Sequence, residues 1–426
     1  MLRLMTRRGV RFHPPALAPG PAVRWMLQRA FGPVGAPDAP GVEAPGVLAL
    51  CRRFELSCRV AARQGRARLA AELGAAAAEG FARDHAAAAG AGLRIVALAE
   101  RVAAVAAPLG VRPVFLKLAA LELGGRLAPG SREGCDLDVL VPAGRAAEVQ
   151  HALVGAGFRA SPMPLYEHQL AALEGPDGVV EVHRMLLGVR VAGRRSATAE
   201  DLDRLGLLQA LPPLAGHAAA VPLPAVAAAH ALAHGIAQHG WTPHAYSLLK
   251  MVADLVDLGL AGPDGPELAA RAARWLARDV AAEEVEAARR LCVALAAGAA
   301  RGAGSMAVDP AEWETSRAPE AVLLRHALAG RLDPGYAESL RLALFRRAPS
   351  DAPAAVRLAR ALARTVWLSR AQVDALYGPP RRRLGYLGRR LRRPLDLVVR
   401  LGRYGLHAWK VRRRRPVLGE GSNRPG

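Results

Sequence analysis

Two aspartates two positions apart, Asp136 and Asp138, lie in the apolar segment 136–141 (DLDVLV). The aliphatic residues of this segment favour a β-strand, and side chains on a strand alternate between its faces, so both carboxylates should project from the same face. Neighbouring carboxylates in an apolar element repel each other and are costly to desolvate, which calls for a counter-charge. A divalent cation meets that need, with Mg²⁺ as the first choice and Mn²⁺ as the second. The same spacing also fits a strand end where two acids face solvent and cap a turn.

The flanking elements would position these acids. Upstream, residues 112–117 (RPVFLK) indicate a second buried strand, and residues 118–123 indicate a helix that ends at Gly124 and Gly125. Downstream, residues 143–158 have helical spacing and close with glycines, as a helix C-terminus should. The predicted order is therefore strand, helix, loop, acidic strand and helix.

This order resembles the DNA-polymerase-β-like nucleotidyltransferase superfamily, in which a Gly-Gly or Gly-Ser turn precedes two aspartates on a strand. More narrowly, the chain resembles a largely uncharacterised bacterial nucleotidyltransferase family with three motifs: a strand ending in lysine, an Arg-x-x-x-Asp-x-Asp segment, and a strand with glutamate and histidine. The matching residues are Lys117, Arg132, Asp136, Asp138, Glu181 and His183. The family has glycine where this chain has Leu118, which puts close backbone approach to a phosphate there in question. The turn at Gly124 and Gly125 is the alternative, and the sequence leaves both open.

The resemblance implies an in-line displacement at an α-phosphorus, with metal ions stabilising the attacking and leaving oxygens. Asp136 and Asp138 would be the metal ligands. Glu181 would be the third carboxylate, acting as a metal ligand or as the base for an acceptor hydroxyl. Strand alternation places Glu181 and His183 on one face of segment 179–183 and the intervening valine on the other. Alternatively, Glu181 is an edge-strand acid that faces water.

Further residues are assigned to the nucleotide. Lys117 and Arg132 are the cations best placed to meet a triphosphate, with arginine offering a two-pronged contact and lysine a point charge. Ser131 stands beside Arg132 in the same loop. His168 and His183 match positions that are often histidine in the family, and either would touch substrate or orient a carboxylate. The alternatives are ordinary surface charge for the two cations and a structural role for each histidine.

Composition restricts the class of protein. A chain of 426 residues with 52% hydrophobic residues can bury a sizeable core over two or three domains. Its four cysteines include no Cys-x-x-Cys pair, which argues against a disulfide framework or a structural zinc site and fits a reducing compartment. The basic N-terminal stretch lacks the apolar centre of a signal peptide, and no apolar run of about 18 residues suggests a membrane span. We therefore expect a cytoplasmic protein.

We expect an α+β fold with a small mixed sheet. The predicted segments are N-terminal helices at 1–90, a nucleotidyltransferase-like α/β core at 91–195, a helical domain at 196–378 and a basic amphipathic tail at 379–426. In the helical domain, His230 and His234 lie four positions apart on one helix face, and Asp254 follows on a later helix. We interpret the histidines as packing or substrate-contacting residues and the helical domain as the other wall of the active-site cleft.

The tail holds much of the net charge of +21, with Lys and Arg outnumbering Asp and Glu by 14 to 1 between Arg381 and Arg415. Residues 394–411 have the spacing of a basic amphipathic helix, which can contact an anionic membrane surface or nucleic-acid phosphates. Alternatively, the segment packs on its own domain with a solvated basic face.

Taken together, the motifs predict a metal-dependent nucleotidyltransferase that moves a nucleoside monophosphate, AMP from ATP in the first instance, to a hydroxyl-bearing acceptor. The sequence does not specify the acceptor. The competing interpretation is a non-catalytic NTP-binding or RNA-binding protein that keeps the fold.

Overall fold

The structure is a computed structural model of the whole chain. It describes residues 20–33, 44–160, 168–191, 196–238, 247–276, 280–297, 318–328 and 385–395, together with the single positions 316, 356, 359, 363, 366, 367 and 373. Most of the predicted tail helix at 394–411 lies outside the described residues.

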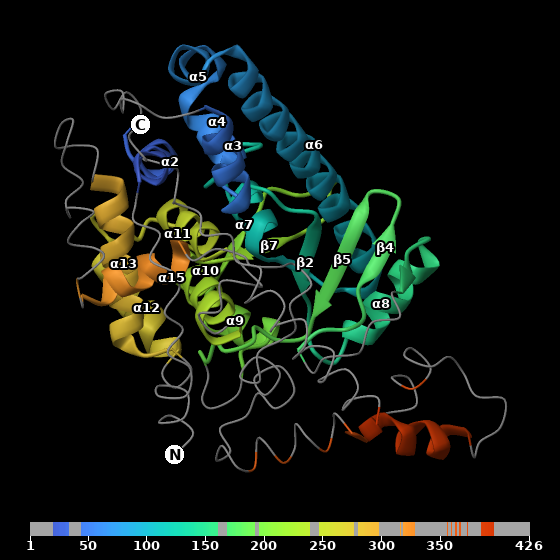
Figure 1. The fold of residues 1–426 in the computed structure, drawn as a ribbon. Helices are drawn as coiled ribbons and strands as arrows, with labels where there is room; N and C mark the ends of the chain where they lie inside the picture. The colour runs from blue at the N-terminus through green and yellow to red at the C-terminus, as the bar shows by residue number, and fades with distance from the viewer. Residues whose placement is uncertain are drawn as a thin grey trace.

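A seven-stranded mixed sheet forms the centre of the protein, with the strand order β3-β4-β5-β2-β1-β7-β6 (Figure 1). β2 pairs in parallel with β5, and β1 pairs in parallel with β7, while the other neighbours are antiparallel. The strands are β1 (Val114–Phe115), β2 (Asp136–Leu140), β3 (Arg159–Ala160), β4 (Leu173–Gly175), β5 (Gly178–His183), β6 (Leu208–Ala210) and β7 (Ala220–Pro222).

The two faces of the central strands differ in character. In β5, Val180 and Val182 are fully buried, and a Cβ placed at Gly178 would lie 3.1 Å from a methyl carbon of Leu98 in helix α6 (Ala75–Ala106). These alternate positions therefore form the face that α6 covers, joined at its edge by α8 (Ala146–Gly155), which packs on α6, β4 and β5. The opposite face carries the polar residues of β2 and β5.

A helical layer adjoins that polar face. α7 (Lys117–Leu123) packs on β2 and β7, and α10 (Pro224–Leu232) packs on α7 and β7. α10 continues without a break into a short π-helical segment, Ala233–Gln238. The remaining helices of this part are α9 (Ala199–Arg204), α11 (Leu248–Asp257), α12 (Gly265–Trp275), α13 (Ala282–Ala297) and α15 (Pro319–Leu328).

Of the four N-terminal helices, the last three pack on the upper part of α6 as drawn in Figure 1, and the first packs on the second and the third. Alanine-rich α6 favours a long helix because alanine has the highest helix propensity. The group comprises α2 (Pro21–Phe31), α3 (Ala44–Arg53), α4 (Ser57–Gln64) and α5 (Arg66–Leu73), and a single 3-10 turn (Ala107–Leu109) follows α6.

The predicted α+β class with a mixed sheet is confirmed. Two features of the structure extend across the predicted segment limits at positions 90 and 195. α6 runs through position 90, and β6 and β7 join the sheet although they follow position 195. The division into four segments stays a prediction. No helix among the described residues is both long and apolar enough to span a membrane.

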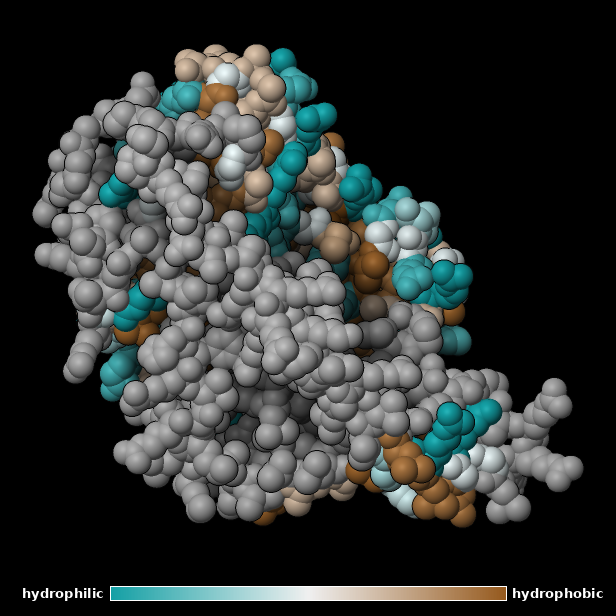
Figure 2. Space-filling model, viewed as in Figure 1, coloured by the Kyte–Doolittle hydropathy of each residue, from teal (hydrophilic) through white to brown (hydrophobic). Residues whose placement is uncertain are grey.

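Residues 385–395 form a helix of the basic tail. Figure 2 shows apolar and hydrophilic side chains next to each other on this helix. Leu387, Leu391 and Leu395 stand four positions apart and are 46%, 63% and 68% exposed. Because that spacing places them on one helix side, the described part of the tail is amphipathic, with an exposed apolar stripe.

Candidate active site

The acids predicted from the sequence meet at the junction of β2 and β5. The parallel register pairs Asp138 with Glu181, so both side chains project from the same face of the sheet. His183, two positions further along β5, projects from that face as well. One donor atom from each of Asp138, Glu181 and His183 lies within 4.8 Å of the others. Asp136 is on the same face at the start of β2 but outside that group of atoms.

Lys117 supplies a positive charge to this group. Its Nζ lies 2.7 Å from Oδ1 of Asp138, and its side chain is 23% exposed. Lys117 is the first residue of α7 and has a left-handed φ of 49°, which is uncommon for a residue with a side chain. Burial works to lower the pKa of Lys117, but Asp138, Asp136 and Glu181 outweigh it and raise that pKa above its ordinary value. Lys117 is therefore a charged ammonium.

His183 also binds Asp138. Its Nε2 lies 2.9 Å from Oδ1 of Asp138 and 3.7 Å from Oε2 of Glu181. Burial works against charge on the imidazole, but the hydrogen bonds with the two carboxylates outweigh it and raise the pKa of His183. The ring donates from Nε2 to the Asp138 carboxylate and so orients it. The His168 ring centroid lies 5.9 Å from that of His183, so His168 is a neighbour of the site.

The two aspartates carry opposite pKa shifts. Burial alone would raise the pKa of Asp138, but Lys117 and His183 beside it hold the pKa below its ordinary value. The pKa of Asp136 is raised, first by burial and then by the charge of Asp138. The negative charge of Asp138 is thus compensated by Lys117 and His183, whereas the negative charge of Asp136 is compensated less and would be stabilised by a further cation.

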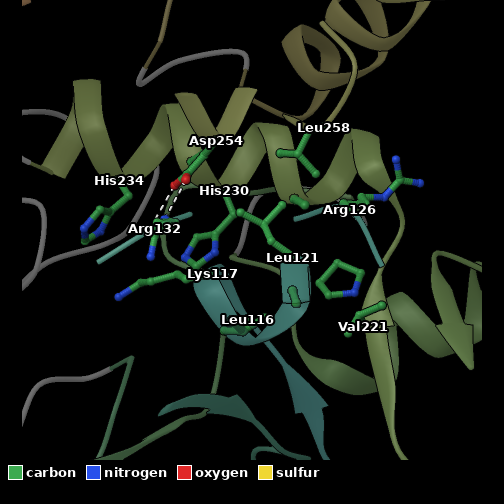
Figure 3. Close-up of a pocket in the computed structure, with 14 residues that line it drawn as sticks. Leu116, Lys117, Leu121, Arg126, Arg132, Val221, His230, His234, Asp254 and Leu258 are labelled. Carbon is green, nitrogen blue, oxygen red and sulfur yellow. Dashed lines mark hydrogen bonds and ion pairs between the residues drawn. The ribbon is translucent and has the colours of Figure 1, made fainter. Parts of the chain in front are cut away.

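Arg132 is paired with a carboxylate of the helical layer. Its Nε and Nη2 bind the two carboxylate oxygens of Asp254 at 2.6 and 2.9 Å, and both side chains are almost fully buried (Figure 3). This fork joins the loop before β2 to α11. Ser131 is buried in the same loop. The roles of Arg132 and Ser131 in nucleotide binding stay predictions.

The structure also places the two candidate phosphate turns. Gly124 and Gly125 end α7: the Arg126 amide donates to the carbonyl of Leu121, and Gly125 has a φ of 67°, as in a helix C-cap. Leu118 is buried, and a Cβ at Gly134 would lie 2.3 Å from its Cδ2. The Leu118 side chain therefore fills space beneath the loop that leads into β2.

A pocket borders this group of charged residues (Figure 3). Lys117, His230, His234 and Arg132 form one end of it. The other walls come from α7, β7, α10 and α11. The lining residues that the structure describes are Leu116, Lys117, Ala120, Leu121, Arg126, Arg132, Val221, Pro222, Ala227, His230, Ala231, His234, Asp254 and Leu258. The sequence indicated the histidines and Asp254. It gave no signal for Val221 or Leu258, since apolar residues that line a pocket have the same pattern as core residues.

The comparisons with known proteins agree with this geometry. Residues 40–292 match the model of a family described as uncharacterised nucleotidyltransferase, which is more than half of the 426-residue chain. The chain belongs to this family. The match spans α3 to the middle of α13 and so includes every strand of the sheet. No curated protein and no solved structure matches the chain.

The site of this nucleotidyltransferase family member fits a divalent metal ion. Oδ1 of Asp138 accepts hydrogen bonds from Lys117 and His183, and Asp136, Asp138 and Glu181 place three carboxylates on this face. A histidine that donates from Nε2 to Asp138 cannot also bind a metal through that atom. The donor set is then made of hard oxygen ligands on one sheet face.

Proposed function

We propose that the protein is a metal-dependent nucleotidyltransferase that moves a nucleoside monophosphate, AMP from ATP, to a hydroxyl-bearing acceptor. The observation that carries the proposal is the meeting of Asp138, Glu181 and His183 on one sheet face, next to Asp136 and Lys117. Mg²⁺ or Mn²⁺ suits this set because both ions prefer carboxylate oxygens.

In the proposed reaction, the acceptor hydroxyl oxygen bonds to the α-phosphorus, and the bond from that phosphorus to the bridging oxygen of pyrophosphate breaks. When bound, the metal supplies positive charge to the attacking and leaving oxygens. Asp136 and Asp138 would hold it. Glu181, whose side chain is 25% exposed, would take the hydroxyl proton, and His183 and Lys117 hold Asp138 in place.

Calorimetry with Mg²⁺ and ATP tests the metal assignment. Wild type should bind ATP only with Mg²⁺, and the double variant Asp136→Asn/Asp138→Asn should lose that binding because two of the three carboxylates become neutral amides. Asp177→Asn, in the turn between β4 and β5 and 47% exposed, is the matched control and should bind as wild type does. Equal binding of Mg²⁺ and ATP by the double variant would refute the proposal.

Transfer is tested separately from binding. Incubation of a cell extract with the protein and α-labelled ATP should place label on an acceptor and release pyrophosphate, and the double variant should do neither. A protein that binds Mg²⁺ and ATP but transfers no label to any extract component would be the non-catalytic nucleotide-binding alternative.

A further inference from the structure

We propose that the pocket between α7, β7, α10 and α11 binds the apolar body of the acceptor and presents its hydroxyl at the end formed by His230 and Lys117. The acceptor is then an alcohol with an aliphatic or alicyclic body. This inference rests on the proposed nucleotidyl transfer, since it specifies the acceptor of that reaction.

The pocket is apolar over most of its wall. Leu121, Val221 and Leu258 contribute from three different elements. On α10, the lining residues Ala227 and Ala231 stand one helical turn apart. Alanine side chains end at Cβ, so these two positions leave room that larger residues would fill. An aliphatic ligand would gain the free energy of burying its surface against these walls.

His230 indicates where a polar group of the ligand would lie. Its side chain faces the pocket in Figure 3, and the residue is 6% exposed. Among the described residues, no hydrogen bond to its imidazole is present. The ring nitrogens are therefore available to a ligand hydroxyl in the pocket, which would donate to the ring or accept from it.

Lys117 links this end of the pocket to the carboxylates. Its side chain lines the pocket, while its Nζ binds Asp138 at 2.7 Å. A hydroxyl held at His230 would thus lie on the side of the pocket that adjoins the metal-binding acids. This is the placement that attack on an α-phosphorus requires.

A nucleobase fits the same pocket less well. Among the lining residues that the structure describes, there is no Phe, Tyr or Trp to stack on a base, and Arg126 is the one polar side chain at the apolar end. A purine has hydrogen-bonding atoms around its edge, and burying them against Leu121, Val221 and Leu258 would leave them without partners. An aliphatic body carries no such atoms.

The test uses 1-octanol as the apolar alcohol and glycerol as the polar one. Saturation-transfer NMR should detect 1-octanol on wild type, and glycerol should give no comparable signal. Ala231→Phe, which fills the pocket, and His230→Leu, which removes the hydrogen-bonding group, should each weaken 1-octanol binding about tenfold. Ala86→Phe adds the same ring on an exposed position of α6 and should leave 1-octanol binding unchanged.

A second measurement on the same variants separates this inference from the proposed function. Ala231→Phe should bind Mg²⁺ and ATP as wild type does while transferring less label from ATP to 1-octanol. Loss of nucleotide binding in Ala231→Phe would assign the pocket to the nucleotide and overturn the inference, as would 1-octanol binding that is equal in all variants. Absence of Mg²⁺-dependent ATP binding in wild type would instead refute the proposed function.

Discussion

The buried ion pair between Arg132 and Asp254 should contribute strongly to the stability of the contact between the loop before β2 and the helical layer. The two residues are 122 positions apart, their contacts are 2.6 and 2.9 Å long, and their side chains are 10% and 7% exposed. Replacing one partner of a buried pair leaves the other charge without its counter-ion, at a cost of about 3–5 kcal/mol. We therefore expect Asp254→Leu and Arg132→Met each to lower the free energy of unfolding by that amount.

The double variant should be far less destabilised than the sum of the singles. Replacing both members of a buried pair by apolar residues is often neutral, because both desolvation costs disappear together. The double-mutant cycle should then give a coupling energy of at least ~3 kcal/mol between Arg132 and Asp254. Urea unfolding followed by tryptophan fluorescence at neutral pH measures all four proteins.

The pair of Arg159 and Glu174 is the matched control. Its contact is 3.0 Å long, but the side chains are 83% and 49% exposed, so water screens the charges. Substituting either residue should change the free energy of unfolding by no more than ~1 kcal/mol. Two results would contradict this prediction: changes in the free energy of unfolding for the single Arg132 and Asp254 variants as small as those for the exposed pair, or additive changes in the double variant. Either would show that the Arg132–Asp254 ion pair does not stabilise the packing of the loop on α11.

Three further predictions follow from other parts of the molecule. Cys135 is exposed while the other three cysteines are buried, so one thiol per chain should react readily with a disulfide reagent. The pKa of the Cys135 thiol is raised by partial burial and then by Asp136, so the rate of this reaction should keep rising above pH 9. Mg²⁺ with ATP should slow the reaction of Cys135. Burial lowers the pKa of His230 from 6.5 to about 3, so the unfolded state binds a proton at this residue at a higher pH than the folded state does. The free energy of unfolding should therefore fall by up to about 5 kcal/mol as the pH drops from 6.5 to 3. In acid unfolding curves, His230→Leu should remove this contribution to the pH dependence of stability. Truncation after Pro380 should leave nucleotide binding intact and weaken any salt-sensitive retention on RNA or anionic liposomes, and equal retention of both proteins would show that the tail does not dock.

The strand periodicity of two was sufficient to predict which acids share a face. In β2 and β5, alternate positions place Asp136 with Asp138 and Glu181 with His183, although Leu140 and Val179 share that face with them. That Asp138 faces Glu181 depends on the register between β2 and β5, which are far apart in the sequence. Register depends on tertiary packing, so the sequence could not provide it.

The sequence did not indicate that β6 and β7 belong to the sheet. β6 and β7 have three residues each, too few for an alternating pattern to be visible, and they belong to the sheet through their pairing with each other and with β1. α6 crosses position 90 although Gly90 and Gly92 stand there, and glycine has a low helix propensity. A Cβ at Gly92 would lie 2.7 Å from a carboxylate oxygen of Glu122 in α7, so tertiary packing at this point favours a residue without a side chain.

The charge balance of the site supports the proposed metal ion, which would act in addition to the cations that the protein itself supplies. The structure provides Lys117 and His183 as hydrogen-bonding partners of Asp138, and the pKa of each is raised by the neighbouring carboxylates. When His183 is protonated, the three carboxylates of Asp136, Asp138 and Glu181 face two positive groups. A divalent ion would turn this surplus of one negative charge into one positive charge, which favours the approach of a triphosphate; without the ion, the same site repels it. Nucleotide affinity should therefore depend on the metal even though no carboxylate here lacks a nearby cation.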